Sequence, residues 1–447
     1  MVTRMAWLPG YGTYTINVTN EPYNPEAGNV VFTRSPPSDI RDGATTALEV
    51  SALEEGASNP SIKSFLDIAN LANLATVKKV PDDKESDDSS TKSQWQAQGD
   101  PTEIAIQVFA ARFGRNSETS SSFDDTEWKQ LVEFPFDSGV KKMSVLSQNK
   151  ESGEVHVLTK GAVERVIDSC VEMSGPDGTL VQMTDSSKAD ILSNMEALAR
   201  RGLRVLALAS RTSPRSVSAE EARLGTLKRD EFECDLIFRG LVGIYDPPRP
   251  ESRPSVFKCH QAGIGVHMLT GDHPETARTI ATEVGILPSR MELLRRDIAQ
   301  GIVMTASDFD RLTDEQIDQL PELPLVVARC APSTKVRMID ALHRRGRYVA
   351  MTGDGVNDSP SLHRADVGIA MGLGGSDVAK SASDIVLSDD NFASILNAVE
   401  EGRRIFDNVQ KFMLHVLAAN VAFVTTLLIG LAYKDDSGIS IFQITPI

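Results

Sequence analysis

Two carboxylates between residues 351 and 360 are spaced so that they could hold a magnesium ion beside a phosphate group. Asp354 and Asp358 lie four residues apart, and glycines on both sides of Asp354 let the backbone turn tightly. The apolar run that precedes them, 348–350, predicts a buried parallel strand. Ligands bind at the carboxyl ends of such strands, and Mg²⁺ takes one or two carboxylates together with phosphate oxygens. A solvated turn is the alternative interpretation of Gly-Asp-Gly by itself.

A second apolar run, 266–269, ends in a similar turn at Thr270, Gly271 and Asp272. The residues that follow, 275–284, place four apolar side chains on one helical face and therefore predict a helix. Taken singly, this turn is weak evidence for a ligand site, because Thr and Asp commonly cap helix N-termini. This turn gains weight as evidence only together with the residues at 351–360.

Residues 351–360 read Met-Thr-Gly-Asp-Gly-Val-Asn-Asp-Ser-Pro, and this string resembles the signature of P-type cation-transporting ATPases. The Thr-Gly-Asp turn at 270–272 comes before it in the order that fits the phosphorylation domain of that family. The resemblance implies a haloacid dehalogenase-like (HAD-like), doubly wound parallel sheet in this region. It also implies that Asp354 holds Mg²⁺ and that Asp358 and the Thr-Gly-Asp turn belong to the catalytic site.

In the N-terminal half of the chain, four residues are of types that could hold a nucleotide. Phe136 could stack on an adenine ring, Lys141 and Lys160 could bind phosphate, and Gly161 would allow close approach. By residue type alone a purely structural role is the stronger interpretation. A Phe on a strand usually belongs to the core, and a Lys usually lies on a solvated face. The resemblance favours the nucleotide site, and it implies that Glu103 approaches the polar edge of the same pocket.

The resemblance assigns further residues to phosphoryl transfer and nucleotide binding. Lys335 would contact an acyl phosphate, and Arg329 would contact the nucleotide phosphates. Both cations are expected at the carboxyl edge of the sheet, where charge develops during the transfer. Arg204 and Asn357 are expected in the nucleotide site as well.

The fold class expected is α/β, with an antiparallel nucleotide-binding sheet, an incomplete HAD-like domain and one transmembrane helix. The early segments resemble most closely the fungal sodium/potassium-exporting subgroup of the family. Asp246 and Arg249, on either side of two prolines, would hold the hinge between the two cytosolic domains. The expected domains are a nucleotide-binding domain at 1–239, a phosphorylation domain lacking its first strand at 240–395, a stalk and transmembrane helix at 396–433, and an extracytosolic loop at 434–447.

Composition limits the classes of partner. The chain has 447 residues and a net charge of −16, which argues against a nucleic-acid partner. Its four cysteines are scattered without a Cys-x-x-Cys pair, so we expect reduced thiols in a cytosolic setting. Two serine-rich stretches, 81–99 and 116–126, are expected to be surface loops.

Residues 412–433 form a largely apolar run that is long enough to cross a membrane as a helix. Basic residues precede the run, which places its N-terminal side in the cytosol. A buried core helix is the alternative. Within the run Asn420 is the candidate ligand for a transported cation, although a hydrogen bond between helices would explain it equally well. The resemblance implies a multi-pass protein in contact with lipid, and the plasma membrane is the expected location.

The nucleophile of the family is absent from these 447 residues. In the family an aspartate in an Asp-Lys-Thr-Gly-Thr string attacks the γ-phosphate of MgATP, and no such string occurs here. Asp308 and Asp310 have the Asp-x-Asp spacing of a related nucleophile but follow the Thr-Gly-Asp turn, so we interpret them as a helix cap. We therefore expect a chain without its first central strand, actuator domain and most transmembrane helices, and catalytically inactive by itself.

The favoured function is ATP-driven export of Na⁺ or K⁺, with this chain supplying ATP binding and the magnesium-binding part of the phosphorylation site. The alternative is a truncated, non-catalytic ATP-binding protein that regulates or competes with a pump. A soluble hydrolase of the related phosphatase superfamily would need an N-terminal Asp-x-Asp strand and no membrane helix, and the sequence meets neither requirement.

Overall fold

The computed structural model describes residues 1–17, 21–40, 48–58, 60–80, 94–115, 127–137, 139–175, 178–215, 217, 221, 227–288 and 301–432. The chain divides into two compact units, each described here by itself. The first comprises Met1–Pro248, His267–Thr313 and Leu320–Cys330, and the second comprises Arg249–Val266, Asp314–Gln319 and Ala331–Ile447. The expected domain boundaries stay predictions, and the loop expected at 434–447 lies outside the described residues.

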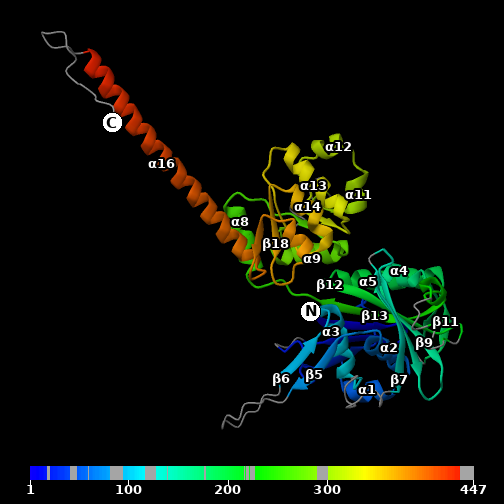
Figure 1. Cartoon of the computed structure of the whole chain (residues 1–447). Helices are drawn as coiled ribbons and strands as arrows, with labels where there is room; N and C mark the ends of the chain where they lie inside the picture. Colours follow the sequence, from blue (N-terminus) through cyan, green and yellow to red (C-terminus); the bar gives the residue numbers. More distant parts are fainter. Residues whose placement is uncertain are drawn as a thin grey trace, which may run out of the picture. The chain divides into compact units, whose positions relative to one another are not determined.

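An 11-stranded sheet forms the body of the first unit (Figure 1). Its main path runs β4-β3-β2-β1-β13-β12-β9-β8-β7, and β10 and β11 join it at β13. Every pairing in it is antiparallel except β10 with β13, so the expected antiparallel sheet is confirmed. The strands are β1 (Val2–Leu8), β2 (Gly12–Ile16), β3 (Val30–Thr33), β4 (Leu48–Val50), β7 (Trp128–Asp137), β8 (Lys142–Asn149), β9 (Val155–Ala162), β10 (Cys170–Ser174), β11 (Leu180–Gln182), β12 (Leu203–Thr212) and β13 (Leu236–Tyr245).

The sheet buries both of its faces, and β1 shows how. Ala6 and Leu8 contribute to one hydrophobic core, while Met5 and Trp7 contribute to the other, because successive side chains point to opposite faces. Helices cover the two faces separately. On the first face lie α2 (Pro60–Leu71) and α3 (Pro101–Arg112), and on the second lie α4 (Val163–Ile167) and α5 (Asp185–Ala199).

Helix α3 is the element that brings Glu103 to the sheet. Asp100 caps the helix by accepting hydrogen bonds from the amides of Thr102 and Glu103, and Pro101 lies in the first turn, where both residue types favour a helix start. One side of α3 packs on the main sheet. The other side places Ile104 and Val108 under the hairpin of β5 (Thr76–Val80) and β6 (Gln94–Gln98). A further short helix, α1 (Ala52–Ser58), precedes α2 in the chain.

Two shorter parallel sheets carry the HAD-like part of the chain. In the first unit the order is β14-β16-β15, and in the second it is β17-β18-β19. Among the strands that the structure describes, β14 is an edge strand of the first of these sheets and β17 is an edge strand of the second. The strands are β14 (Met268–Leu269), β15 (Val303–Thr305), β16 (Val326–Ala328), β17 (Ala350–Gly353), β18 (Val367–Met371) and β19 (Ile385–Leu387); the helices are α8 (Ser252–Gln261), α9 (Pro274–Glu283), α11 (Ala306–Arg311), α12 (Asp314–Gln319), α13 (Pro332–Arg344), α14 (Ser359–Arg364) and α15 (Asp377–Ser381).

Three local predictions were wrong. The strand expected at 348–350 begins only at Ala350, and Tyr348 is 95% exposed. Val349 instead exchanges hydrogen bonds with Asp366 in the turn before β18. The cap of α11 is Thr305, whose hydroxyl accepts from the amide of Asp308. Strand β6 forms at the end of the expected loop 81–99, because it finds a pairing partner in β5. The rest of that loop and the loop 116–126 lie outside the described residues.

One helix carries the apolar run near the end of the chain. Helix α16 spans Phe392–Ala432, and among the described residues it is the one helix long and apolar enough to cross a membrane. It appears at the C-terminal end of the colour gradient in Figure 1. Helix α15 ends at Ser381 and β19 follows, and α16 begins eleven residues after Ser381. The expected helical membrane segment is thus present in length and composition.

Candidate functional site

A buried ion pair joins the sheet to helix α3. The Nζ atom of Lys160, on β9, lies 2.7 Å from Oε1 of Glu103, in the first turn of α3. The two side chains are 8% and 13% exposed. The other oxygen of Glu103 accepts a hydrogen bond from the amide of Leu74 at 3.1 Å, so both carboxylate oxygens are held. The structure therefore brings together two residues expected to line one nucleotide pocket.

Burial lowers the pKa of Lys160 below its ordinary range, although the ion pair with Glu103 acts in the opposite direction. Taking both charges out of water is costly, and the pair is compensated only by its short distance and its second hydrogen bond. A polar ligand could therefore exchange contacts with either partner without first removing a well-solvated charge.

The close approach of two backbone segments next to the pair explains why residue 161 is a glycine. A Cβ atom on Gly161 would lie 2.5 Å from the carbonyl oxygen of Lys141, on the neighbouring strand connection. That same oxygen accepts a hydrogen bond from the amide of Ala162 at 3.0 Å. Lys141 itself has a φ of 57°, a left-handed conformation that costs a non-glycine residue free energy. The close approach that Gly161 permits in this structure is thus the approach of the Lys141 backbone.

Phe136 lies at the end of β7, next to the strained Lys141. The residue is 64% exposed, so its ring is open to a partner or ligand. Asp137 holds the start of the turn, because its carboxylate accepts hydrogen bonds from the amides of Gly139 and Val140. These two bonds lower the pKa of Asp137. The exposed ring and Lys141 are therefore presented by a turn with internal hydrogen bonds.

Strand register places Arg204 at the same end of the sheet. Leu206 pairs with Ala162 and Leu208 pairs with Lys160, so Arg204 lies just beyond the end of β9 and on the face that carries Lys160. Its guanidinium lies 2.8 Å from the carboxylate of Asp272. A residue expected to bind the nucleotide, Arg204, is thus paired with a residue expected in the catalytic site, Asp272.

The Thr270-Gly271-Asp272 turn is built onto the end of β16 in the same unit. The amide of Thr270 donates to the carbonyl of Val327, and the amide of Arg329 donates to the carbonyl of Asp272. Arg329 has a φ of 59°, so it resembles Lys141 in its left-handed backbone. Its guanidinium lies 2.5 Å from Glu164 at the start of α4. These ion pairs are half exposed, and exposed pairs add little stability.

The second unit holds the other part of the expected phosphorylation site. Lys335, in the first turn of α13, lies 2.5 Å from Asp358, which is 11% exposed in its side chain. The second oxygen of Asp358 faces the amide of Gly355 at 3.4 Å. Gly353 is required here, because a Cβ on it would lie 2.6 Å from the Cβ of Asp358. Asp354 is exposed, and it is therefore the carboxylate in this loop that is open to a metal ion.

The remaining candidate residues are either exposed or paired with residues outside the candidate site. Asn357 is exposed within a single 3₁₀ turn, and Asn420 is exposed on α16. Asp246 lies 3.9 Å from the N-terminal amine of Met1, and Arg249 donates to the carbonyl of Asp389, so each hinge residue has a partner within its own unit. Among the described residues no group of three or more His, Cys, Asp or Glu side chains is arranged to hold a metal ion.

Comparison with known proteins gives the family. A family model described as P-type ATPase, cytoplasmic domain N, matches residues 61–251, and one described as haloacid dehalogenase-like hydrolase matches residues 177–366. A "Sodium/potassium exporting P-type ATPase 2" of Saccharomyces cerevisiae is 46% identical over the whole of this chain. The chain belongs to the P-type ATPases. The family predicted from the string at 351–360 is thereby confirmed.

Other relatives of this P-type ATPase chain include bacterial proteins. A "Sodium/potassium exporting P-type ATPase" of Schizosaccharomyces pombe is 46% identical over the whole chain, and a "Probable cation-transporting ATPase F" of Mycobacterium bovis is 41% identical over 76% of it. The chain spans 43%, 40% and 35% of the length of the three relatives, respectively. It therefore corresponds to less than half of each relative.

Two features of the site could not be predicted from the sequence. The left-handed residues Lys141 and Arg329 form backbone hydrogen bonds with residues distant in sequence, Ala162 and Asp272, which no local pattern shows. A polar network beneath the turn after Phe136 was also missed, because Arg229 and Glu233 lie 87 and 89 residues along the chain from their partners Lys142 and Ser144.

We predict that Gly161→Ala destabilises the first unit by roughly 1–3 kcal/mol, because the new Cβ would push the Lys141 carbonyl away. Urea unfolding followed by tryptophan fluorescence reports this unit, which holds all three tryptophans of the chain. Gly301→Ala is the matched control, since nothing lies within 4 Å of a Cβ there. Equal unfolding midpoints for the two variants would contradict the close approach.

Proposed function

We propose that this chain binds MgATP at the end of the large sheet, within a P-type pump that exports Na⁺ or K⁺. The observation that carries the proposal is the buried Lys160–Glu103 pair beside the exposed Phe136 ring and the Lys141 turn. Three neighbouring strands end here, since Asp137 pairs with Lys142 and Lys142 pairs with Gly161. An aromatic face, cations and one carboxylate at a single sheet end suit an adenine nucleotide.

Each residue has a role in the proposed site. The Phe136 ring stacks on the adenine base, and Glu103 accepts a hydrogen bond from the polar edge of that base. Lys141, Lys160 and Arg204 supply positive charge to the phosphates. Exchange of the Lys160–Glu103 contact for contacts with the nucleotide keeps both buried charges compensated.

The magnesium part of the proposal rests on the loop after β17. Mg²⁺ needs few protein carboxylates when phosphate oxygens and water complete its shell. Asp354 is the exposed carboxylate there, whereas Asp358 is occupied by Lys335 and the Gly355 amide. The residues present therefore fit a magnesium ion held mainly by Asp354. The ion neutralises phosphate charge when bound, and Lys335 supplies a cation in the same loop system.

The transported ion and the membrane are proposed from the relatives and from α16. Two of the relatives are named as sodium/potassium exporting ATPases. Helix α16 is long and apolar enough to cross a membrane, and Asn420 offers an amide oxygen within its apolar part. The hydroxyls of Thr425 and Thr426 donate to carbonyls one turn earlier in the helix. We propose that Asn420 is a ligand of the cation in a multi-pass protein of the plasma membrane.

Binding of ATP to the whole chain in detergent micelles tests the nucleotide site. Lys160→Ala should raise the Kd for MgATP at least about tenfold, because a charge-assisted contact is lost and Glu103 is left buried and unpaired. Isothermal titration calorimetry measures the change. Lys129→Ala is the control, since Lys129 is exposed on the same sheet, in β7. An unchanged Kd in Lys160→Ala would refute the site.

Export of Na⁺ and K⁺ from cells that express the complete gene tests the transport part. Asp354→Asn should abolish ATP-dependent efflux of both ions, because the proposed magnesium ligand loses its charge. The control is Asp377→Asn, at an exposed carboxylate on α15. Efflux that persists in Asp354→Asn would contradict the proposed magnesium site, and a wild-type gene without any effect on either ion would contradict the export function.

A further inference from the structure

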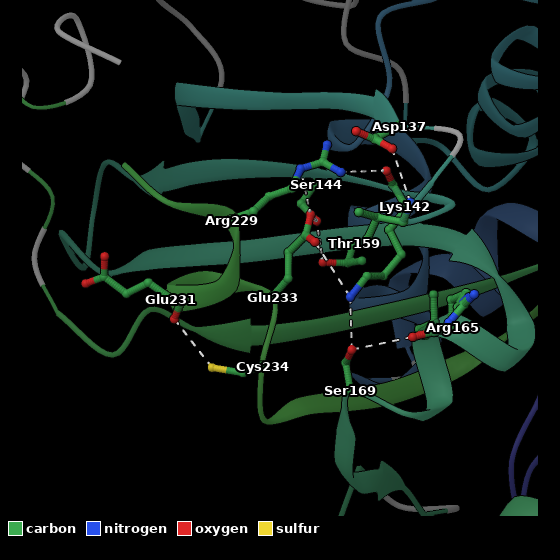
Figure 2. Close-up of polar contacts among 12 residues, drawn as sticks. Asp137, Lys142, Ser144, Thr159, Arg165, Ser169, Arg229, Glu231, Glu233 and Cys234 are labelled. Atoms are coloured by element: carbon green, nitrogen blue, oxygen red, sulfur yellow. Dashed lines mark hydrogen bonds and ion pairs between the residues drawn. The ribbon is translucent and has the colours of Figure 1, made fainter. Parts of the chain in front are cut away.

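A buried polar network joins Glu233, Ser144 and Lys142 (Figure 2). It lies beneath the turn that presents Phe136, and on the face of the sheet opposite Lys160, because Ser144 contacts Thr159 and side chains alternate along β9. Its centre is Glu233, whose side chain is 3% exposed and directly follows the short helix α7 (Arg229–Phe232). One oxygen of Glu233 accepts from the Ser144 hydroxyl at 2.7 Å. The other oxygen lies 3.6 Å from Nζ of Lys142. Ser144 also contacts the hydroxyl of Thr159 at 2.9 Å.

Arg229 connects this network to the turn itself. One of its terminal nitrogens donates to the carbonyl of Lys142 at 3.3 Å, and the other donates to the carbonyl of Pro135. Pro135 and Lys142 stand immediately before and after the segment that carries Phe136 and Lys141. The guanidinium fork thus holds both ends of the turn at once. A lysine ammonium lacks the planar fork for two such carbonyls.

Glu233 in turn holds Arg229. Its carboxylate lies 3.7 Å from Nε of Arg229 and balances part of the charge of Arg229 and Lys142, which are both largely shielded from water. Phe232 fixes the helix that carries Arg229, because it is fully buried and packs against Phe134 with ring centroids 6.3 Å apart. The connected parts leave the turn little freedom to change its shape.

We infer that Arg229 and Glu233 are positioning residues for the nucleotide, which hold the turn so that Phe136 is ready to stack on the base. The inference rests on the proposed nucleotide site. A preformed turn avoids the entropy cost of ordering Phe136 when the nucleotide binds. Neither residue faces the Lys160 side of the sheet, so they act through the turn and make no contact with the ligand.

The test compares variants of the whole chain in detergent micelles by their Kd for MgATP. Arg229→Lys keeps the charge beside Glu233 but loses the fork, and it should raise the Kd about fivefold or more. Glu233→Gln should act in the same direction, because Gln can still accept from Ser144 but no longer holds Arg229 by charge. Glu231→Gln is the control on the same helix, since Glu231 forms an exposed pair with Arg215. Tryptophan fluorescence checks that each variant is folded.

A double-mutant cycle with Phe136→Ala separates positioning from a general loss of structure. If Arg229 acts through Phe136, Arg229→Lys should change the Kd less than about twofold in the Phe136→Ala background. Phe136 is mostly exposed, so its removal leaves the fold intact. The inference is overturned if Arg229→Lys binds MgATP like the wild type, or if its full effect persists without Phe136. Failure of the wild-type chain to bind MgATP would instead overturn the proposed function, and with it the positioning role.

Discussion

The buried pair of Lys160 and Glu103 is the interaction on which the candidate site depends. Two charges that are almost removed from water are tolerated only with a close partner and further hydrogen bonds, and this pair has both. The pair also requires that helix α3 starts where it does, because Glu103 lies in its first turn beside the Asp100 cap. A shift of α3 along the sheet would leave Lys160 buried without its counter-charge.

The register of the sheet gives its two faces different roles. On one face Lys160, Glu103 and Arg204 surround the place proposed for the nucleotide. On the other face Glu233 and Arg229 fix the turn that carries Phe136. Because side chains alternate along each strand, Lys160 and the neighbouring Thr159 contribute to opposite faces. One strand, β9, therefore contributes to both binding and positioning.

The sequence predicted the parts of this protein whose patterns are local. The antiparallel sheet follows from the family resemblance and the apolar run in α16 from hydropathy, and the structure has both. The family resemblance also predicted that Lys160 and Glu103 lie close together, and the structure pairs them although 57 residues separate them. These predictions used information that adjacent residues or a family resemblance supply.

The failures share a physical cause, which is dependence on contacts distant in sequence. Tyr348 was expected in a strand, but Val349 bonds to Asp366 and leaves the tyrosine ring in solvent. The left-handed backbone of Lys141 depends on a carbonyl contact with Gly161 on another strand. The role of Glu233 requires β8, β9 and α7 to meet, which no pattern within one segment reveals.

Hydrogen exchange of the whole chain, with and without MgATP, tests the central claim most directly. Bound nucleotide should slow the exchange of amides in peptides that cover Phe136, Lys141 and Lys160, and it should leave helix α5 unchanged, because α5 packs on the opposite face of the sheet. Exchange that is unaffected at this end of the sheet at saturating MgATP, or slowed only elsewhere in the first unit, would contradict the proposed nucleotide site.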